Sequence, residues 1–219
     1  PVKRWLHNSG VVGKKNYQSV YLKQNTWMRM SPGQKKWAEA HAEQYFTTIP
    51  PGFVWTVDLK MNSWLNVSGK DKLVNGKGNM LIKIFSLIPV VNAKNNPKID
   101  TGTLQRYLGE MVWFPGAAIQ SYISWTEIDQ QTARATITVN GNSASGTFYF
   151  SEEGWVKKFS TWRYMGGGQQ SPLREWIINV QEHRILKGIH IPVRMTATWR
   201  LEERDWTWLR LEVTDICYT

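Results

Sequence analysis

The sequence predicts a mainly β protein of the α+β class, with about ten antiparallel strands in one strongly curved sheet or half-barrel. Segments rich in aromatic and β-branched residues recur along the chain and are separated by Gly, Pro and Asn clusters. Residues 101–122 instead show helical spacing and form a central insertion. One helical segment cannot cover ten flat strands, so we expect the sheet to curl around it.

The 219 residues contain no long linker, no repeat of solenoid period and no low-complexity segment. This length suits one all-β domain with its own core. We therefore expect residues 1–219 to form a single domain.

The first elements are a short helix and long strands. Residues 1–8 suit a helix that has Pro1 in its first turn. Residues 16–30 are typical of a strand that ends at the turn of residues 31–33. In residues 35–48, Ala and Glu favour a helix, but polar and small residues alternate, and this period of two favours a strand. The segments 53–61, 65–74 and 78–85 follow as a meander with glycines at its corners.

The helical segment has two faces. Leu104, Leu108 and Met111 form an apolar stripe. Arg106, Glu110 and Trp113 cluster on the nearly opposite side, and Asp100 or Thr101 is placed to cap the helix. Pro115-Gly116 interrupts it, and a second short helix is expected before the strands resume.

The C-terminal part returns to strands. Asn140-Gly141 is a strong hairpin signal between two of them. His190 is expected in a loop before Pro192. In the closing strand, residues 206–218, alternation predicts a core face and a polar, tryptophan-studded face. The core face comprises Leu209, Leu211 and Val213, and the polar face comprises Trp208, Arg210 and Glu212.

Composition restricts the partners. The net charge is +10 and the pI about 9.7, but the basic residues are scattered, so we expect no nucleic-acid binding. An anionic membrane surface remains open as a partner. No stretch reaches the ~18 apolar residues of a membrane span. The sequence opens on Pro1 without an initiator Met, which leaves room for a removed signal or anchor. Oligomeric state is left open.

Motifs for chemistry are missing. The four histidines have no metal-ligand spacing, so no metal site is expected. Glycine-rich stretches match neither phosphate-loop pattern, and no nucleophile elbow occurs. The single cysteine, Cys217, excludes an intrachain disulfide and is expected as a buried thiol. We assign no cofactor and no catalytic residue.

Thirteen tryptophans indicate a cavity or interface where indole edges stay polar. For the face that carries Glu110 two interpretations remain. The i,i+4 pair with Arg106 lies at the surface, or this face looks into the mouth of the sheet, where a desolvated carboxylate needs a cation or a raised pKa. Candidate partners of Glu110 are Arg163, Arg194 and Arg200. The candidate ligand-binding residues are Arg106, Glu110, Trp113, Trp55, Phe85 and Trp162.

Four strings carry a resemblance to a known family: AEQYFTTIPPGFVW (42–55), GKGNMLIKIFSLIPVVNAK (76–94), TLQRYLGEMVWFPGAAIQSYISW (103–125) and the W-x-L-x7-L-R-L pattern from Trp199. With them the chain resembles an uncharacterised bacterial family of unknown function with an RYLxEhxWFP motif, usually with Ala where this chain has Gly109. The resemblance implies a tether through an N-terminal hydrophobic anchor but no reaction. Because Gly in a helix costs ~1 kcal/mol relative to Ala, we expect a looser helix or a close backbone contact there.

Three functions remain open. The first is a non-catalytic module that binds an apolar or amphipathic, lipid-like ligand in a Trp-lined concavity. The predicted curved sheet is similar to the half-barrels of lipoprotein carriers, which is an analogy at the level of the fold. The second is an enzyme that uses Glu110 as a buried acid or base. The third is a protein that meets anionic lipid at the membrane surface.

Overall fold

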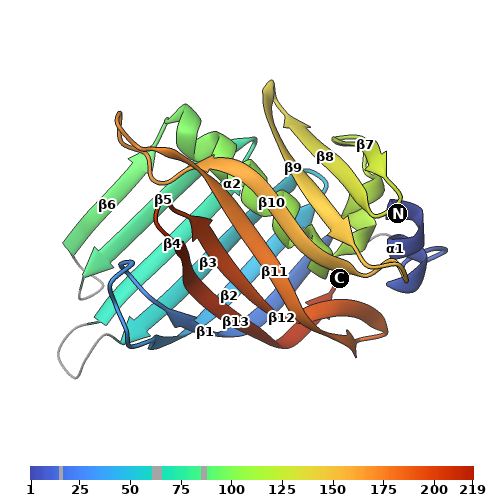
Figure 1. Ribbon diagram of the computed structural model, residues 1–219, viewed down its shortest axis with the longest axis horizontal. Helices are drawn as coiled ribbons and strands as arrows, with labels where there is room; N and C mark the ends of the chain where they lie inside the picture. Colours follow the sequence, from blue (N-terminus) through green and yellow to red (C-terminus); the bar gives the residue numbers. More distant parts are fainter. Residues whose placement is uncertain (15–16, 61–65, 85–87) are drawn as a thin grey trace.

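Thirteen antiparallel strands form one open sheet in the computed structural model, which describes residues 1–14, 17–60, 66–84 and 88–219. The sheet curves strongly around a helix near its middle (Figure 1). The predicted fold class is confirmed, although the sheet has more strands than the ten expected. The strands are β1 Ser19–Met28, β2 Ala38–Thr48, β3 Pro51–Lys60, β4 Asn66–Val74, β5 Lys77–Ile84, β6 Ile88–Lys94, β7 Ile123–Asp129, β8 Thr132–Val139, β9 Asn142–Phe150, β10 Val156–Tyr164, β11 Leu173–Leu186, β12 Ile189–Arg200 and β13 Asp205–Tyr218.

Two meanders meet in the middle of the sheet. The strand order is β6-β5-β4-β3-β2-β1-β13-β12-β11-β10-β9-β8-β7. Strands β1 and β13 pair from Val20 opposite Tyr218 to Met28 opposite Leu209. The outer edges of the sheet are therefore β6 and β7, which are joined in sequence by the helical segment.

The helical segment crosses from one sheet edge to the other. It consists of α2 (Pro97–Glu110) and two 3-10 helices, η1 (Met111–Trp113) and η2 (Pro115–Ile119). Helix α2 packs against strands of both meanders, and Figure 1 shows it inside the curve of the sheet. The short helix predicted for residues 1–8 is present as α1 (Val2–Asn8). It lies at the end of the molecule opposite β6 (Figure 1).

Helix α2 begins earlier than predicted. The side chain of Asn96 accepts a hydrogen bond from Lys98 N at 2.9 Å, and Pro97 occupies the first helical position. Asp100 is therefore not the cap. Its carboxylate instead accepts from Gly78 N at 2.8 Å and from Lys77 Nζ at 2.9 Å, which ties the first turn of α2 to β5.

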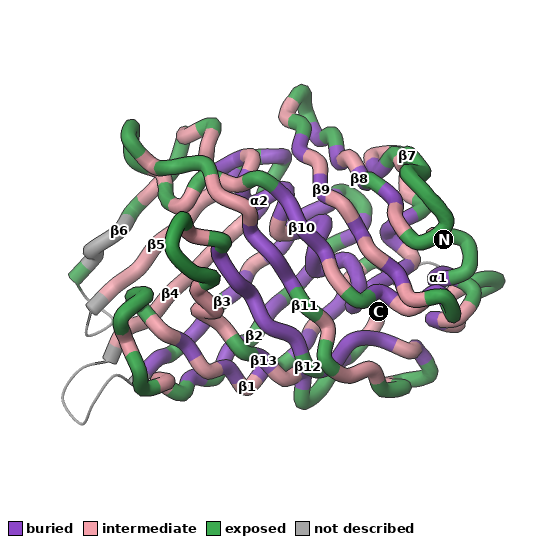
Figure 2. The backbone as a smooth tube through the Cα atoms, viewed as in Figure 1, coloured by how far each residue is buried: buried purple, intermediate pink, exposed green. Residues whose placement is uncertain are grey.

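Both faces of α2 are enclosed. Leu104, Leu108 and Met111 are fully buried, which confirms the apolar stripe. Figure 2 shows the buried residues concentrated in α2 and the central strands. At Gly109, a Cβ would lie 2.7 Å from Ile178 Cδ1. The close neighbour of this glycine is thus a side chain of the sheet, and not the backbone that the sequence analysis allowed for.

Alternation explains most strands. Burial in β2 alternates from Glu39 to Thr48, which confirms the choice of strand over helix for this segment. Asn140 and Gly141 both have positive φ, 48° and 80°, as the predicted two-residue hairpin requires. The buried faces of strands from both meanders therefore pack against α2.

Strand β13 departs from simple alternation at a bulge. The β12 partner changes from Ala197 opposite Leu209 to Thr198 opposite Thr207, so Trp208 is the extra residue. Leu211 and Val213 face the core as predicted. The prediction that Trp208 shares the polar face was wrong, because the bulge turns its side chain to the concave side, where it lines a cavity.

Two further predictions need correction. Cys217 is exposed and not buried, because the pairing with β1 passes from Val213 to Asp215, and this bulge at Thr214 shifts the alternation so that Ile216 faces the core. His190 lies in β12, not in a loop, and pairs with Ile185 of β11. Its ring contacts Trp155 with centroids 4.2 Å apart.

Candidate functional site

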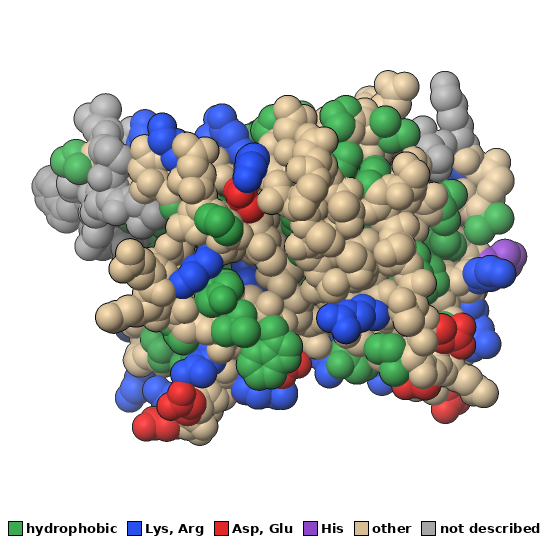
Figure 3. Space-filling model, turned by 90° about the horizontal axis from the view of Figure 1, so that it is seen from above, with side chains coloured by type: hydrophobic (Ala, Val, Ile, Leu, Met, Phe, Trp, Pro, Cys, Tyr) green, Lys and Arg blue, Asp and Glu red, His purple; other side chains and the backbone are tan. Residues whose placement is uncertain are grey.

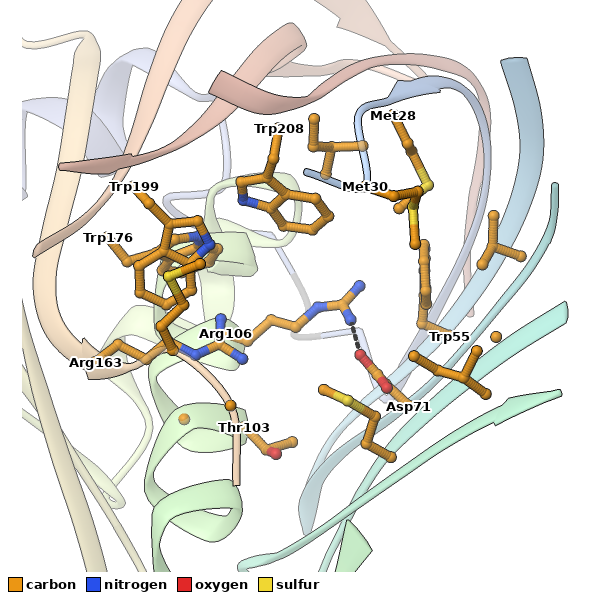
Figure 4. Close-up of a pocket in the computed structure, with 18 of the residues that line it drawn as sticks. Met28, Met30, Trp55, Asp71, Thr103, Arg106, Arg163, Trp176, Trp199 and Trp208 are labelled. Carbon is orange, nitrogen blue, oxygen red and sulfur yellow. Dashed lines mark hydrogen bonds and ion pairs between the residues drawn. The ribbon is translucent and has the colours of Figure 1, made fainter. Parts of the chain in front are cut away.

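A cavity of about 370 Å³ lies between α2 and the concave side of the sheet. Strands β1, β3, β4 and β5 line one side, and β11, β12 and β13 line the other. Figure 4 shows aromatic and methionine side chains around it, with charged groups reaching in from α2, β4 and β10. The labelled apolar residues are Met28, Met30, Trp55, Trp176, Trp199 and Trp208.

One wall of the cavity is a tryptophan row, defined here as Trp176, Trp199, Trp206 and Trp208. Trp176 pairs with Trp199 and Trp199 with Trp206 across three adjacent strands. The rings of Trp176 and Trp199 lie 6.5 Å apart, and the bulge adds Trp208. The Nε1 groups of Trp176, Trp206 and Trp208 are buried and find no acceptor in the described part of the chain. The row thus combines apolar surface with unused donors.

A buried ionic network forms the opposite part of the lining. Arg106 Nε donates to Glu110 Oε1 at 2.8 Å, and Arg106 Nη1 donates to Asp71 Oδ2 at 2.6 Å. Gln44 Nε2 donates to Glu110 Oε2 at 2.7 Å. The guanidinium also lies over the Trp55 ring at 4.6 Å. One arginine therefore joins α2 to β4 and holds two carboxylates.

Burial governs the protonation of this network. It raises the pKa of Glu110 above its ordinary value, and the Arg106 charge and the hydrogen bonds from Arg106 and Gln44 oppose that rise only in part. Burial acts to lower the pKa of Arg106, but Glu110 and Asp71 outweigh it and hold this pKa above its ordinary value. Arg106 thus stays charged.

A second arginine, Arg163 of β10, enters the cavity without a carboxylate partner. Among the described residues its guanidinium forms no ion pair and donates no hydrogen bond. Its guanidinium lies over Trp176 at 4.7 Å and Trp199 at 6.0 Å. Burial, followed by the charge of Arg106, lowers the pKa of Arg163 to about 10. Gly102 makes room for it, since a Cβ there would lie 2.9 Å from Arg163 Nε.

Three predicted site residues lie at this cavity. Trp55, Arg106 and Glu110 all line it. Glu110 is 7% exposed, so the surface-pair interpretation of its face does not apply. Of its candidate partners, Arg163 lies in the cavity, whereas Arg194 and Arg200 of β12 form ion pairs with Glu182 and Glu175 of β11 and do not line it.

The other predicted residues lie elsewhere. Trp113 is fully buried and donates from Nε1 to Pro192 O at 3.0 Å. It does not share the face of Arg106 and Glu110, because α2 ends at Glu110 and the 3-10 turn rotates later residues differently. Trp162 is 64% exposed and borders a second, more polar cavity. Phe85 lies outside the described residues.

The tryptophan row was missed at the sequence level. Trp199 and Trp206 flank the turn of a closing hairpin, which is a signal that both rings can meet on one face. Trp208 had no such signal, because nothing in the alternation reveals the bulge. Arg163 was named only as one of three possible partners.

The described residues contain neither a metal-binding cluster nor a membrane-spanning helix. The described part of the chain holds no group of three or more His, Cys, Asp or Glu side chains arranged to bind a metal ion. Within the same residues, no helix combines the length and the apolar character that a membrane crossing requires.

Fold and site together define a class: an open antiparallel half-barrel, crossed by a helix, with an aromatic cavity between helix and sheet. The chain belongs to DUF6920, a family of unknown function, whose model matches residues 1–218. The sequence matches no curated protein.

Two solved structures are similar to this chain. A DUF1329 family protein from Desulfovibrio piger is similar with a TM-score of 0.50 and 7% identity, over 99% of this chain and 91% of that chain. A LolA superfamily protein, NE2245 from Nitrosomonas europaea, has a TM-score of 0.46 and 8% identity, over 98% and 92%. At such identities the first similarity concerns the fold alone.

Proposed function

We propose that this protein is a non-catalytic module that binds one amphipathic, lipid-like molecule in the cavity beside α2. The observation that carries the proposal is the cavity itself. Its volume of about 370 Å³ lies in the ~300–1,000 Å³ range of small-molecule sites, and a mostly apolar lining with a few convergent polar groups is typical of them.

The two sides of the cavity suit the two parts of such a ligand. Met28, Met80 and the aliphatic side chains of the lining offer apolar and polarisable contact to a chain. Arg163 and the neighbouring Nε1 group of Trp176 offer donors to a head group. Methionine side chains adapt to irregular shapes, so this lining tolerates variation in chain length.

The contacts of Glu110 favour binding over acid–base chemistry. Each of its carboxylate oxygens already accepts a hydrogen bond, one from Arg106 and one from Gln44. A general base needs an oxygen that reaches a substrate proton. Glu110 is better suited to hold Arg106 in place than to exchange a proton with a ligand.

The test uses delipidated protein and a polarity-sensitive fluorescent dye. We expect saturable dye fluorescence, displaced by single-chain amphiphiles, and a matching bound mass in native mass spectrometry. Ile82→Trp adds bulk to the cavity lining and is expected to reduce dye binding. Ile128→Trp makes the same change at a position that is 56% exposed on β7, and it serves as the control. Failure of dye and amphiphiles to bind would overturn the proposal.

A further inference from the structure

We propose that the cavity selects an oxyanionic head group, a carboxylate or a phosphate monoester, and that Arg163 is the residue that binds it. This inference rests on the proposed function and names the ligand class for the same site. Its basis is the set of buried polar groups of the cavity that have no hydrogen-bond partner among the described residues.

The buried polar groups of the lining that have no hydrogen-bond partner among the described residues are all donors. They are Arg29 Nε and the Nε1 groups of Trp176, Trp206 and Trp208. Two buried acceptors, Gln44 Oε1 and Gln105 Oε1, also lack a partner, but neither residue lines this cavity. A buried donor without a partner is costly, so a ligand rich in acceptors is the complementary one.

The other cations of the lining are engaged. Arg106 is bound to Asp71 and Glu110. Lys98 Nζ donates to the carbonyl oxygens of Gly168 at 2.9 Å and Gln169 at 2.7 Å.

Arg29 is also held in place, because its Nη2 donates to Lys35 O at 3.1 Å and its guanidinium stacks on Trp37. Arg163 is therefore the cationic side chain of the lining whose N–H groups donate to no described residue.

The net charge of the cavity lining also favours an anionic ligand. The lining carries four cationic side chains, Arg29, Lys98, Arg106 and Arg163, against two carboxylates, Asp71 and Glu110. Figure 3 shows Lys and Arg side chains among hydrophobic ones on one face of the molecule. A guanidinium pairs with a carboxylate or phosphate through two parallel hydrogen bonds. An anion beside Arg163 would accept from its donors and reduce the excess positive charge of the lining.

Figure 4 shows Arg163, Trp176 and Trp199 on the same side of the cavity. The Nε1 group of Trp176, whose ring centroid lies 4.7 Å from the guanidinium of Arg163, is therefore available near it. Together they form a donor-rich end to a pocket whose lining also includes methionine and aliphatic side chains such as Met80, Leu59 and Ile82. Only the head group of an amphiphile needs to reach this end.

The experiment compares three probes with the same alkyl chain: dodecanoate, dodecyl phosphate and dodecanol. Binding to the delipidated protein is measured by displacement of the polarity-sensitive dye. We expect dodecanoate and dodecyl phosphate to bind about ten- to a hundred-fold more tightly than dodecanol, the factor that corresponds to one charge-assisted hydrogen bond. The two anions distinguish a carboxylate from a phosphate head.

Variants locate the effect. Arg163→Gln is expected to remove most of the preference for the anions and to leave dodecanol binding unchanged. Arg163→Lys keeps the charge without the planar fork, so an intermediate preference is expected. Arg134→Gln removes the same charge from an exposed position on β8 outside this cavity and is the control. Thermal unfolding of each variant checks that it is folded.

The outcomes separate the two proposals. Equal binding of dodecanol and the anions would overturn the inference and leave the proposed function standing. An anion preference that Arg163→Gln does not change would overturn the assignment to Arg163. Binding of none of the three probes would overturn the proposed function and the inference with it.

Discussion

Arg106 and Glu110, one turn apart on α2, form an ion pair with Nε and Oε1 2.8 Å apart inside the curve of the sheet. Arg106 also reaches Asp71 on β4, which makes it a link between the helix and the sheet as well as a partner within the helix. All three side chains are at most 17% exposed. Because these side chains are so deeply buried, the loss of any one of the three charges affects the other two.

Arg106→Gln is expected to destabilise the fold more than Glu110→Gln. The first change leaves Asp71 and Glu110 without their common cation, which costs about 3–5 kcal/mol in a buried pair. The second leaves Arg106 paired with Asp71 and costs about 1–3 kcal/mol for the lost charged hydrogen bonds. Urea unfolding of both variants measures the difference. Equal losses would show that Asp71 and Glu110 do not depend on Arg106 jointly.

The raised pKa of Glu110 predicts a pH dependence of stability. The folded state holds this proton more tightly than the unfolded state, so the stabilisation by Glu110 is complete below its ordinary pKa of 4.5 and is lost as pH rises through the folded value. We expect the difference in free energy of unfolding between wild type and Glu110→Gln to fall as pH rises above 4.5. A difference that grows over that range would contradict the direction of the shift.

His183 predicts the opposite slope. Burial, with a smaller effect of the His190 charge, lowers the pKa of His183 from 6.5 to about 4. Its stabilisation is present above pH 6.5 and is lost as pH falls towards 4. His183→Phe keeps an aromatic ring beside Trp155, 5.7 Å away, and is expected to remove this loss. Thermal unfolding at pH 7 and at pH 4.5 compares the two proteins; an identical loss in both would refute the prediction.

Two tryptophans make a matched pair for stability. Trp113→Ala removes a fully buried indole and its hydrogen bond to Pro192 O, with an expected cost of about 3–5 kcal/mol. Trp162→Ala changes a residue that is 64% exposed and is expected to stay within about 0.5 kcal/mol of wild type. Chemical denaturation measures both. Similar losses of stability in the two variants would mean that Trp162 is packed against the protein in solution and is not exposed.

Gly78 allows α2 to lie close to β5. A Cβ at this position would lie 2.8 Å from Ile99 O, a backbone atom that cannot move without shifting the helix. Gly78→Ala is expected to cost about 1–3 kcal/mol through overpacking. At Gly33, nothing lies within 4 Å of the added Cβ, so Gly33→Ala is the control. An unchanged stability of Gly78→Ala would show that the helix adjusts freely.

The parts of the fold that follow from local patterns were predictable from the sequence. The period of two in residues 38–48, the Asn140-Gly141 turn and the stripe of Leu104, Leu108 and Met111 each depend on near neighbours in the chain. The curved sheet followed from them, because one helix cannot cover so many flat strands.

The site was predictable only in part, because it is assembled from strands distant in sequence. Arg106 and Glu110 were found from helical spacing. Asp71, Gln44 and the tryptophan row belong to other elements, and their approach depends on register. Trp208 depends on a bulge, and Trp113 on a change from α to 3-10 geometry, neither of which the residue types reveal.

The pairing of β1 with β13 has a consequence for how the molecule assembles. Each meander consists of contacts between neighbours in the chain, which form quickly. The seam between them joins residues as far as 200 positions apart, as in the contact of Ser19 with Thr219. During synthesis, β1 would therefore wait with an unpaired edge until β13 emerges, and the slow step of folding is expected to be the closure of this seam.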